Sequence, residues 1–197
     1  MSSARDFILD LQDPSTTTGE KVSFLSDIGS VIPRSIQVAS GRQSGKTTLA
    51  ADAIVREVER LQQGLAVTHS VDRVNICYVA ANQTLVDQGL SKIRSTAEDH
   101  EVHLNWGRGF GRTMGQTLNS SDPAFEIHIH GFIALPSGIG NVSLACADEA
   151  DVTPVTLWSV LMGSSAFSHR VLKLGTPSAY FSLPPSTPNE LVFDFTS

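Results

Sequence analysis

Two stretches of the chain repeat apolar residues at the spacing of an α-helix. In the first stretch, after Gly45, the apolar stripe is formed by Leu49, Ala53, Ile54, Val58 and Leu61. In the second, after Asn82, it is formed by Val86, Leu90, Ile93 and Ala97. Steps of three and four residues place side chains on one helix face, so the pattern predicts two helices. We expect the charged residues 56, 57, 59 and 60 on the other face of the first helix, a stop near Gly64, and Asn82 as the cap of the second helix.

Short apolar runs lie between and beyond these helices. Residues 74–80, VNICYVA, are nearly all apolar, which fits a strand buried on both faces. We expect further strands at 35–40, 102–105, 142–147, 170–174 and 191–195, a strand or hairpin at 125–135, and a helix at 153–166. Strands that alternate with helices predict an α/β fold, in which a mostly parallel sheet has helices on both faces.

Composition places the chain among globular proteins. It has 197 residues, of which 41% are hydrophobic and 17% are charged, which suits one domain of ordinary size. We divide it into a lead-in at residues 1–33 and a main domain at residues 34–197. The 14 Lys and Arg against 20 Asp and Glu give a net charge of −6, which excludes nucleic-acid binding through an overall basic surface. The net charge does not exclude nucleic-acid binding through a local basic patch.

The sequence favours a cytosolic protein. No apolar run approaches the roughly 18 residues of a membrane span, and the N-terminal residues lack the apolar stretch of a secretory signal. Cys77 and Cys146 each lie in an apolar run, so we interpret them as small buried residues rather than as a disulfide or part of a zinc site.

The most specific motif joins a predicted strand to the first helix. It reads SGRQSGKTT over residues 40–48, where a P-loop has glycine, any four residues and then Gly-Lys-Ser/Thr. Ser40 stands in place of the first glycine, and the rest matches. Backbone N–H groups at a helix start, together with the helix dipole, favour a phosphate there. In such a loop Gly45 lets the backbone approach the phosphates, Lys46 neutralises them, and the Thr47 hydroxyl binds Mg²⁺.

Two carboxylates follow the apolar run at 142–147. Ligands of open α/β sheets lie beyond the carboxyl ends of the strands, so Asp148 and Glu149 should reach the same edge as the phosphate loop. Asp148 can hold the magnesium, directly or through water, and Glu149 can orient or deprotonate the water that attacks a phosphate. The pair therefore favours nucleotide hydrolysis over binding alone.

Together these motifs resemble the ATPase domain of the large terminase subunit, the DNA-packaging motor of tailed bacteriophages. That family has a P-loop of the form Arg-Gln-x-Gly-Lys-Thr without the first glycine, as at residues 42–47 here. It also has an apolar strand that ends in Asp-Glu, and further on a coupling motif built around Thr-Pro, as at residues 175–177. The resemblance runs from residue 36 to residue 178. It implies a three-layer αβα P-loop NTPase of the ASCE or RecA-like type.

The resemblance also implies a role for each of these residues. ATP would be bound by Gly41, Arg42, Gln43, Ser44, Gly45, Lys46, Thr47 and Thr48. Mg²⁺ would be held by Thr47 and Asp148. Glu149 would be the catalytic carboxylate, and Lys46 and Arg42 would stabilise the charge on the γ-phosphate. Hydrolysis would be coupled to movement of DNA through Gly175, Thr176 and Pro177. No adenine contact can be assigned.

The partners that the resemblance implies are double-stranded DNA, the capsid portal, a small terminase subunit and further copies of the chain in a ring, all in the cytoplasm of an infected host. A full large terminase continues into an RNase H-like nuclease, so we expect this chain to be either a truncated form or a split gene product that carries the ATPase part. Arg108 and Arg112 lie in a glycine-rich stretch, GRGFGRT, where they would contact a DNA backbone or a neighbour's phosphates, unless the loop is simply solvated.

Two other functions fit parts of the sequence. Residues 148–151 spell DEAD, as in the first RecA-like domain of a nucleic-acid helicase, although SGRQSGKT fits the helicase loop less well. A nucleotide-binding assembly domain with little turnover is the third hypothesis.

Two histidines and two tryptophans also stand out in the sequence, and we assign no catalytic or binding role to them. His128 and His130 lie on one face of a strand without further metal ligands nearby, so we interpret them as structural. We interpret Trp106 and Trp158 as core or interface residues.

Overall fold

The computed structural model describes residues 35–65, 73–108, 116–122, 125–133, 139, 142–150, 170–176 and 190–195. Its helices are α2 (Lys46–Leu65) and α3 (Gln83–Asp99). Its strands are β1 (Ser35–Ser40), β2 (Arg73–Val79), β3 (Asn105–Arg108), β4 (Gln116–Asp122), β5 (Phe125–Phe132), β6 (Val142–Ala147), β7 (Arg170–Gly175) and β8 (Glu190–Phe195). The lead-in at 1–33, the helix expected at 153–166 and Trp158 lie outside the described residues.

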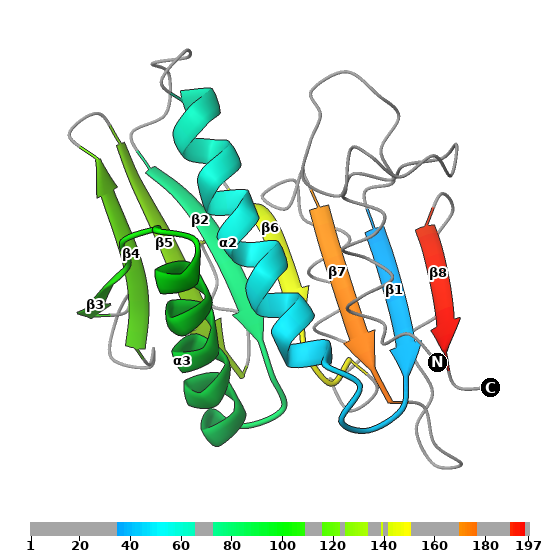
Figure 1. Cartoon of the computed structure of the whole chain (residues 1–197). Helices are drawn as coiled ribbons and strands as arrows, with labels where there is room; N and C mark the ends of the chain where they lie inside the picture. Colours follow the sequence, from blue (N-terminus) through cyan, green and yellow to red (C-terminus); the bar gives the residue numbers. More distant parts are fainter. Residues whose placement is uncertain are drawn as a thin grey trace.

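The eight described strands pair into one sheet, in the order β3-β4-β5-β2-β6-β7-β1-β8 (Figure 1). From β5 onward in this order all neighbours run parallel, whereas β4 is antiparallel to both β3 and β5. Although α2 and then β2 follow β1 in the chain, β6 and β7 lie between β1 and β2 in the sheet. The fold is therefore α/β with a mixed, mostly parallel sheet, as the alternation of strands and helices predicts.

Both helices lie on the same face of the sheet (Figure 1). α2 crosses β6 and β7, and α3 packs on β2, β4 and β5. The apolar stripes predicted for the two helices are confirmed, and they pack with side chains of the sheet in one core. The sheet contributes to this core Ile36, Ile76, Leu118, Ile129, Leu144 and Leu172. Among the described residues, no helix is both long enough and apolar enough to cross a membrane.

α2 is buried more completely than its amphipathic pattern predicts. Glu57, expected on a solvent-facing side, is 0% exposed, and its Oε1 lies 2.6 Å from Arg60 Nη2. A buried carboxylate needs a partner, and Arg60 provides one. The helix also continues past the expected stop at Gly64 to Leu65.

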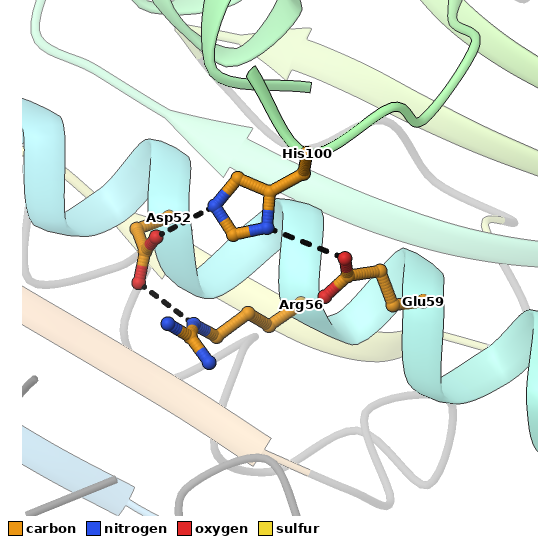
Figure 2. Close-up of polar contacts among 4 residues, drawn as sticks. All are labelled: Asp52, Arg56, Glu59 and His100. Carbon is orange, nitrogen blue, oxygen red and sulfur yellow. Dashed lines mark hydrogen bonds and ion pairs between the residues drawn. The ribbon is translucent and has the colours of Figure 1, made fainter. Parts of the chain in front are cut away.

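α3 packs along α2, and a polar cluster joins the two helices there (Figure 2). His100, the C-cap of α3, reaches between two carboxylates of α2: its Nδ1 lies 3.3 Å from Glu59 Oε1 and its Nε2 lies 3.4 Å from Asp52 Oδ1. Arg56 Nε donates to Asp52 Oδ2 at 3.0 Å. Asn82 caps the other end of α3, as predicted, by accepting the Leu85 N–H at 3.0 Å.

The antiparallel edge of the sheet differs from the sequence prediction. β4 was not expected, because its sequence, QTLNSSD, is mostly polar. A strand was expected at 102–105, but β3 begins only at Asn105, and Val102 and Leu104 are buried in the segment that leads to it. Trp106 is 39% exposed on β3 beneath the Arg94 guanidinium, so it is not a core residue of the described structure.

Candidate nucleotide-binding site

The phosphate loop and the acidic pair meet at the carboxyl edge of the sheet. β1 ends at Ser40 and β6 ends at Ala147, and the parallel strand β7 lies between them. Parallel strands end at one edge, so the segments that follow all three strands emerge there. Thr47 Oγ1 donates a 2.6 Å hydrogen bond to Asp148 Oδ2, although the two residues are 101 positions apart. The fold thus brings both sequence motifs into direct contact.

The phosphate loop turns through two residues with positive φ, Gln43 at 59° and Gly45 at 88°. Left-handed backbone costs little only for glycine, so this conformation favours glycine at position 45. At Gly41 an added Cβ would meet no heavy atom within 4 Å, so packing does not require glycine there. Ser40, in place of the first glycine of the motif, shares a 2.6 Å hydroxyl–hydroxyl hydrogen bond with Ser44, which braces the loop.

The Lys46 ammonium lies within the loop and is held by it. Its Nζ donates to the carbonyl oxygens of Ser40, at 3.2 Å, and Gly41, at 2.7 Å. Ser44 Oγ is 3.5 Å away, and Lys46 as a whole is only 9% exposed. α2 begins at Lys46, so the N–H groups of its first turn, which have no acceptor within the helix, lie beside this positive charge. A fixed cation next to a helix start suits a phosphate.

Asp148 is a buried carboxylate, 6% exposed, that accepts three hydrogen bonds. Its Oδ2 accepts from Thr47 Oγ1 and, at 3.0 Å, from the Tyr78 hydroxyl, and its Oδ1 accepts from the backbone N–H of Glu149 at 3.1 Å. Burial, and then the charge of Asp148, raise the pKa of Tyr78, so its hydroxyl stays protonated and donates. Sequence reasoning missed Tyr78, whose only signal is a phenol within an almost wholly apolar strand.

Glu149 occupies a tight turn directly after Asp148. Its φ is 57°, and it is half-buried. The turn is tied to strands on both sides, because Asp148 N–H donates to Val79 O at 2.8 Å and Ala150 N–H donates to Leu174 O at 2.7 Å. A left-handed residue other than glycine is uncommon, and such residues gather at functional sites. The backbone here is therefore fixed around the two carboxylates.

The donor set fits Mg²⁺ bound together with phosphates. Thr47 and Asp148 offer a hydroxyl and a carboxylate oxygen, which are the hard ligands that Mg²⁺ prefers. Among the described residues no group of three or more His, Cys, Asp or Glu side chains could hold a metal ion. Two protein ligands are nevertheless appropriate, because Mg²⁺ in nucleotide sites commonly takes its other ligands from phosphate and water.

Other residues singled out in the sequence are placed as follows. Arg42 is exposed on the loop, Thr48 is half-buried in the first turn of α2, and Thr176 follows Gly175 at the end of β7, on the same sheet edge. Pro177 and Arg112 lie outside the described residues. Arg108 ends β3, which β4, β5, β2, β6 and β7 separate from β1.

The rings of the two histidines of β5 form a stacked row with the ring of Phe132. The His128 and His130 rings are 5.9 Å apart, and His130 and Phe132 are 5.7 Å apart. His128 contacts Glu126 at 2.8 Å, and His130 contacts Asn75 at 2.9 Å. Both cysteines, Cys77 and Cys146, are buried and free.

Solved structures of other proteins share this architecture. No family model matches the sequence, and no curated protein matches it. The large terminase of the thermophilic bacteriophage D6E in complex with ATP-γ-S superposes with a TM-score of 0.58 at 11% identity, over 89% of this chain and 38% of that one. The large terminase ATPase domain of Thermus phage P74-26 superposes with a TM-score of 0.50 at 13% identity, over 98% of this chain and 86% of that domain.

The chain has the fold of a large terminase ATPase domain. The resemblance stated from the motifs is thus confirmed at the level of the fold, as is the ASCE-type α/β architecture. The D6E large terminase has also been solved in complex with ADP, and that structure superposes with a TM-score of 0.56 at 10% identity. This terminase-like chain spans 38% of the length of the D6E protein.

Proposed function

We propose that this chain is an Mg²⁺-dependent ATPase, and that it is the part of a viral large terminase that uses ATP hydrolysis to move double-stranded DNA into a procapsid. The observation that carries the proposal is the Thr47–Asp148 hydrogen bond, which joins the phosphate loop to the acidic pair within a terminase-type fold. A glycine-bearing turn before a helix, or an acidic pair after a strand, also occurs in proteins that hydrolyse no nucleotide. Their contact across the sheet edge assembles the groups that a nucleotide-hydrolysing site needs.

The loop residues 41–48 and the start of α2 would hold the triphosphate. Lys46, fixed by loop carbonyls, would shift its hydrogen bonds from Ser40 and Gly41 to phosphate oxygens. Thr47 and Asp148 would hold Mg²⁺, which when bound neutralises charge on the β- and γ-phosphates. The solved D6E complexes with ATP-γ-S and ADP support adenine nucleotides as the ligand class.

Glu149 would be the catalytic carboxylate. Its turn follows the metal-holding Asp148 directly, so it would orient a water molecule for in-line attack on the γ-phosphate and accept a proton from it. Lys46 and the exposed Arg42 would stabilise the negative charge that spreads over the γ-phosphate oxygens. A second arginine, Arg108 or Arg112 of a neighbouring subunit, would complete the site in a ring.

Coupling to DNA would pass through the end of β7. Gly175 and Thr176 lie at the same sheet edge as the acidic pair, and Pro177 follows them. Because Ala150 N–H is bonded to Leu174 O, a shift of the acidic turn on hydrolysis would reach this segment directly. Double-stranded DNA, a portal and a small terminase subunit are the partners that such a motor needs.

Nucleotide binding and turnover, measured in the wild type and in variants of two site residues, test the proposal. Lys46→Ala should lose both nucleotide binding and phosphate release. Glu149→Gln should retain binding and lose turnover by about 10²- to 10⁴-fold, the usual contribution of general acid–base catalysis. The matched controls are Lys92→Ala, an exposed lysine on α3, and Glu101→Gln, an exposed glutamate whose φ of 59° resembles that of Glu149. Wild-type turnover in Glu149→Gln would refute the catalytic assignment.

Added DNA tests the motor part separately. We expect double-stranded DNA to raise the rate of phosphate release without separation of its strands. Preference for single strands, together with strand separation, would instead identify a helicase core. Nucleotide binding without turnover, even with DNA and at concentrations at which the chain assembles, would identify a nucleotide-dependent assembly domain.

A further inference from the structure

Tyr78 connects the core of the domain to the proposed metal site. It belongs to β2, where it pairs in register with Cys146 of β6, two residues before Asp148. The residue is 1% exposed and belongs to the core beneath α2 and α3. Its hydroxyl donates to Asp148 Oδ2 at 3.0 Å. The phenol therefore spans from the apolar core to a charged oxygen at the sheet edge.

The two hydroxyls on Asp148 Oδ2 differ in how firmly they are held. Thr47 is exposed at the start of α2, and its oxygen is the one proposed to bind the metal. Tyr78 is fixed by packing on α3: an added Cβ at Gly89 would overlap its ring and hydroxyl. If Thr47 turns toward Mg²⁺, the Tyr78 hydrogen bond is still available to keep the carboxylate in its rotamer.

We propose that Tyr78 is a positioning residue that orients the Asp148 carboxylate for Mg²⁺, with Gly89 providing the space that its ring needs. The inference rests on the proposed function, because it assumes that Asp148 holds a metal beside a nucleotide. Groups that orient a metal ligand typically change metal affinity or activity about 10- to 100-fold when removed. Nothing in the short-range sequence pattern marks Tyr78 for this role.

The experiment measures how a fluorescent, non-hydrolysable ATP analogue binds, in EDTA and over a series of free Mg²⁺ concentrations. Tyr78→Phe keeps the ring against Gly89 and removes only the donor. Binding in EDTA should match the wild type, because Lys46 and the loop are intact. The Mg²⁺ concentration for half-maximal tightening should rise about tenfold or more.

Gly89→Ala provides a second perturbation that leaves Tyr78 itself unchanged. Its Cβ would displace the phenol ring, so it should raise the Mg²⁺ requirement in the same direction. Cys77→Ala is the matched control. It removes a fully buried side-chain atom from the adjacent position of β2, in the separate core cluster on the opposite face of the sheet, and should leave the Mg²⁺ dependence unchanged.

The outcomes separate the two proposals. An unchanged Mg²⁺ dependence in Tyr78→Phe overturns the positioning role and leaves the proposed function standing. An equal shift in Cys77→Ala also overturns it, because the effect would then be one of general stability. If the folded wild type binds no nucleotide with or without Mg²⁺, the proposed function fails and the inference fails with it.

Discussion

We predict that replacing His130 with glutamine makes the fold less sensitive to acid. His130 is 2% exposed on β5, next to Ile129, whose side chain faces the helices, so His130 points to the other face of the sheet. Its Nε2 lies 2.9 Å from Asn75 Oδ1, an oxygen that only accepts, so Nε2 carries the hydrogen of the neutral ring. A second proton would have to enter at Nδ1, which is buried and has no hydrogen-bond partner among the described residues.

The magnitude follows from the pKa. Burial, followed by the positive charges of His128 and Arg73, lowers the pKa of His130 from 6.5 to about 4. Between these values the unfolded chain binds more protons than the folded one, so stability falls as the pH drops through this window. At about 1.4 kcal/mol per pKa unit, His130 should account for a loss of about 2 kcal/mol between pH 7 and pH 5.

Urea unfolding at pH 7 and pH 5 measures this contribution. Glutamine retains an N–H donor for Asn75 and cannot gain a proton, so His130→Gln should lose about 2 kcal/mol less than the wild type between the two pH values. The other titrating groups are common to both proteins and cancel in the comparison. His103→Gln, at an exposed position, is the control and should follow the wild type. Equal losses in wild type and His130→Gln would refute the reasoning.

Three further predictions concern the fold around the site. Asn82→Ala should lower the free energy of unfolding by about 1 kcal/mol, measured by urea titration, because it removes the N-cap of α3, and Asn82→Ser should restore most of it. Gly131→Ala should cost about 2 kcal/mol in the same assay, since its Cβ would overlap side chains of α3, whereas Gly41→Ala, with open space around it, should cost little. Burial raises the pKa of both thiols, Cys77 and Cys146, so neither should react with iodoacetamide in the folded protein, and both should react in urea; modification of the folded protein would show that β2 and β6 open readily.

The strongly periodic elements were predictable from local sequence. The apolar stripes predicted after Gly45 and Asn82 lie within α2 and α3, and the runs at β2 and β6 form strands at or within one residue of their predicted bounds. The Asn82 cap was predictable for the same reason, because a cap is set by residues three positions apart. The phosphate loop and the acidic pair are likewise short motifs, so their residues could be named as candidates from the sequence alone.

Three features were decided only by packing between distant segments. β4 forms from a polar sequence because β5 and β3 offer it backbone hydrogen bonds on both sides. Glu57 is buried because other parts of the fold pack around α2. The spacing of apolar residues within α2 does not predict this burial. The order β6-β7-β1, which sets the acidic turn beside the P-loop, depends on the pairing of β7 with β6 and with β1, and in the second of these Ser35 lies opposite Val171.

The proposed site likewise combines residues that the sequence indicates with contacts that depend on the tertiary structure. Residue types and spacing were sufficient to indicate Lys46, Thr47, Asp148 and Glu149 as candidates for one nucleotide site. The Tyr78 hydrogen bond to Asp148 was not predictable, because it depends on the register of β2 against β6 and on a glycine in α3 that leaves space for the ring. Short-range patterns record which chemistry a chain carries, whereas the relative position of side chains distant in sequence is set by the packing of the whole sheet and its helices.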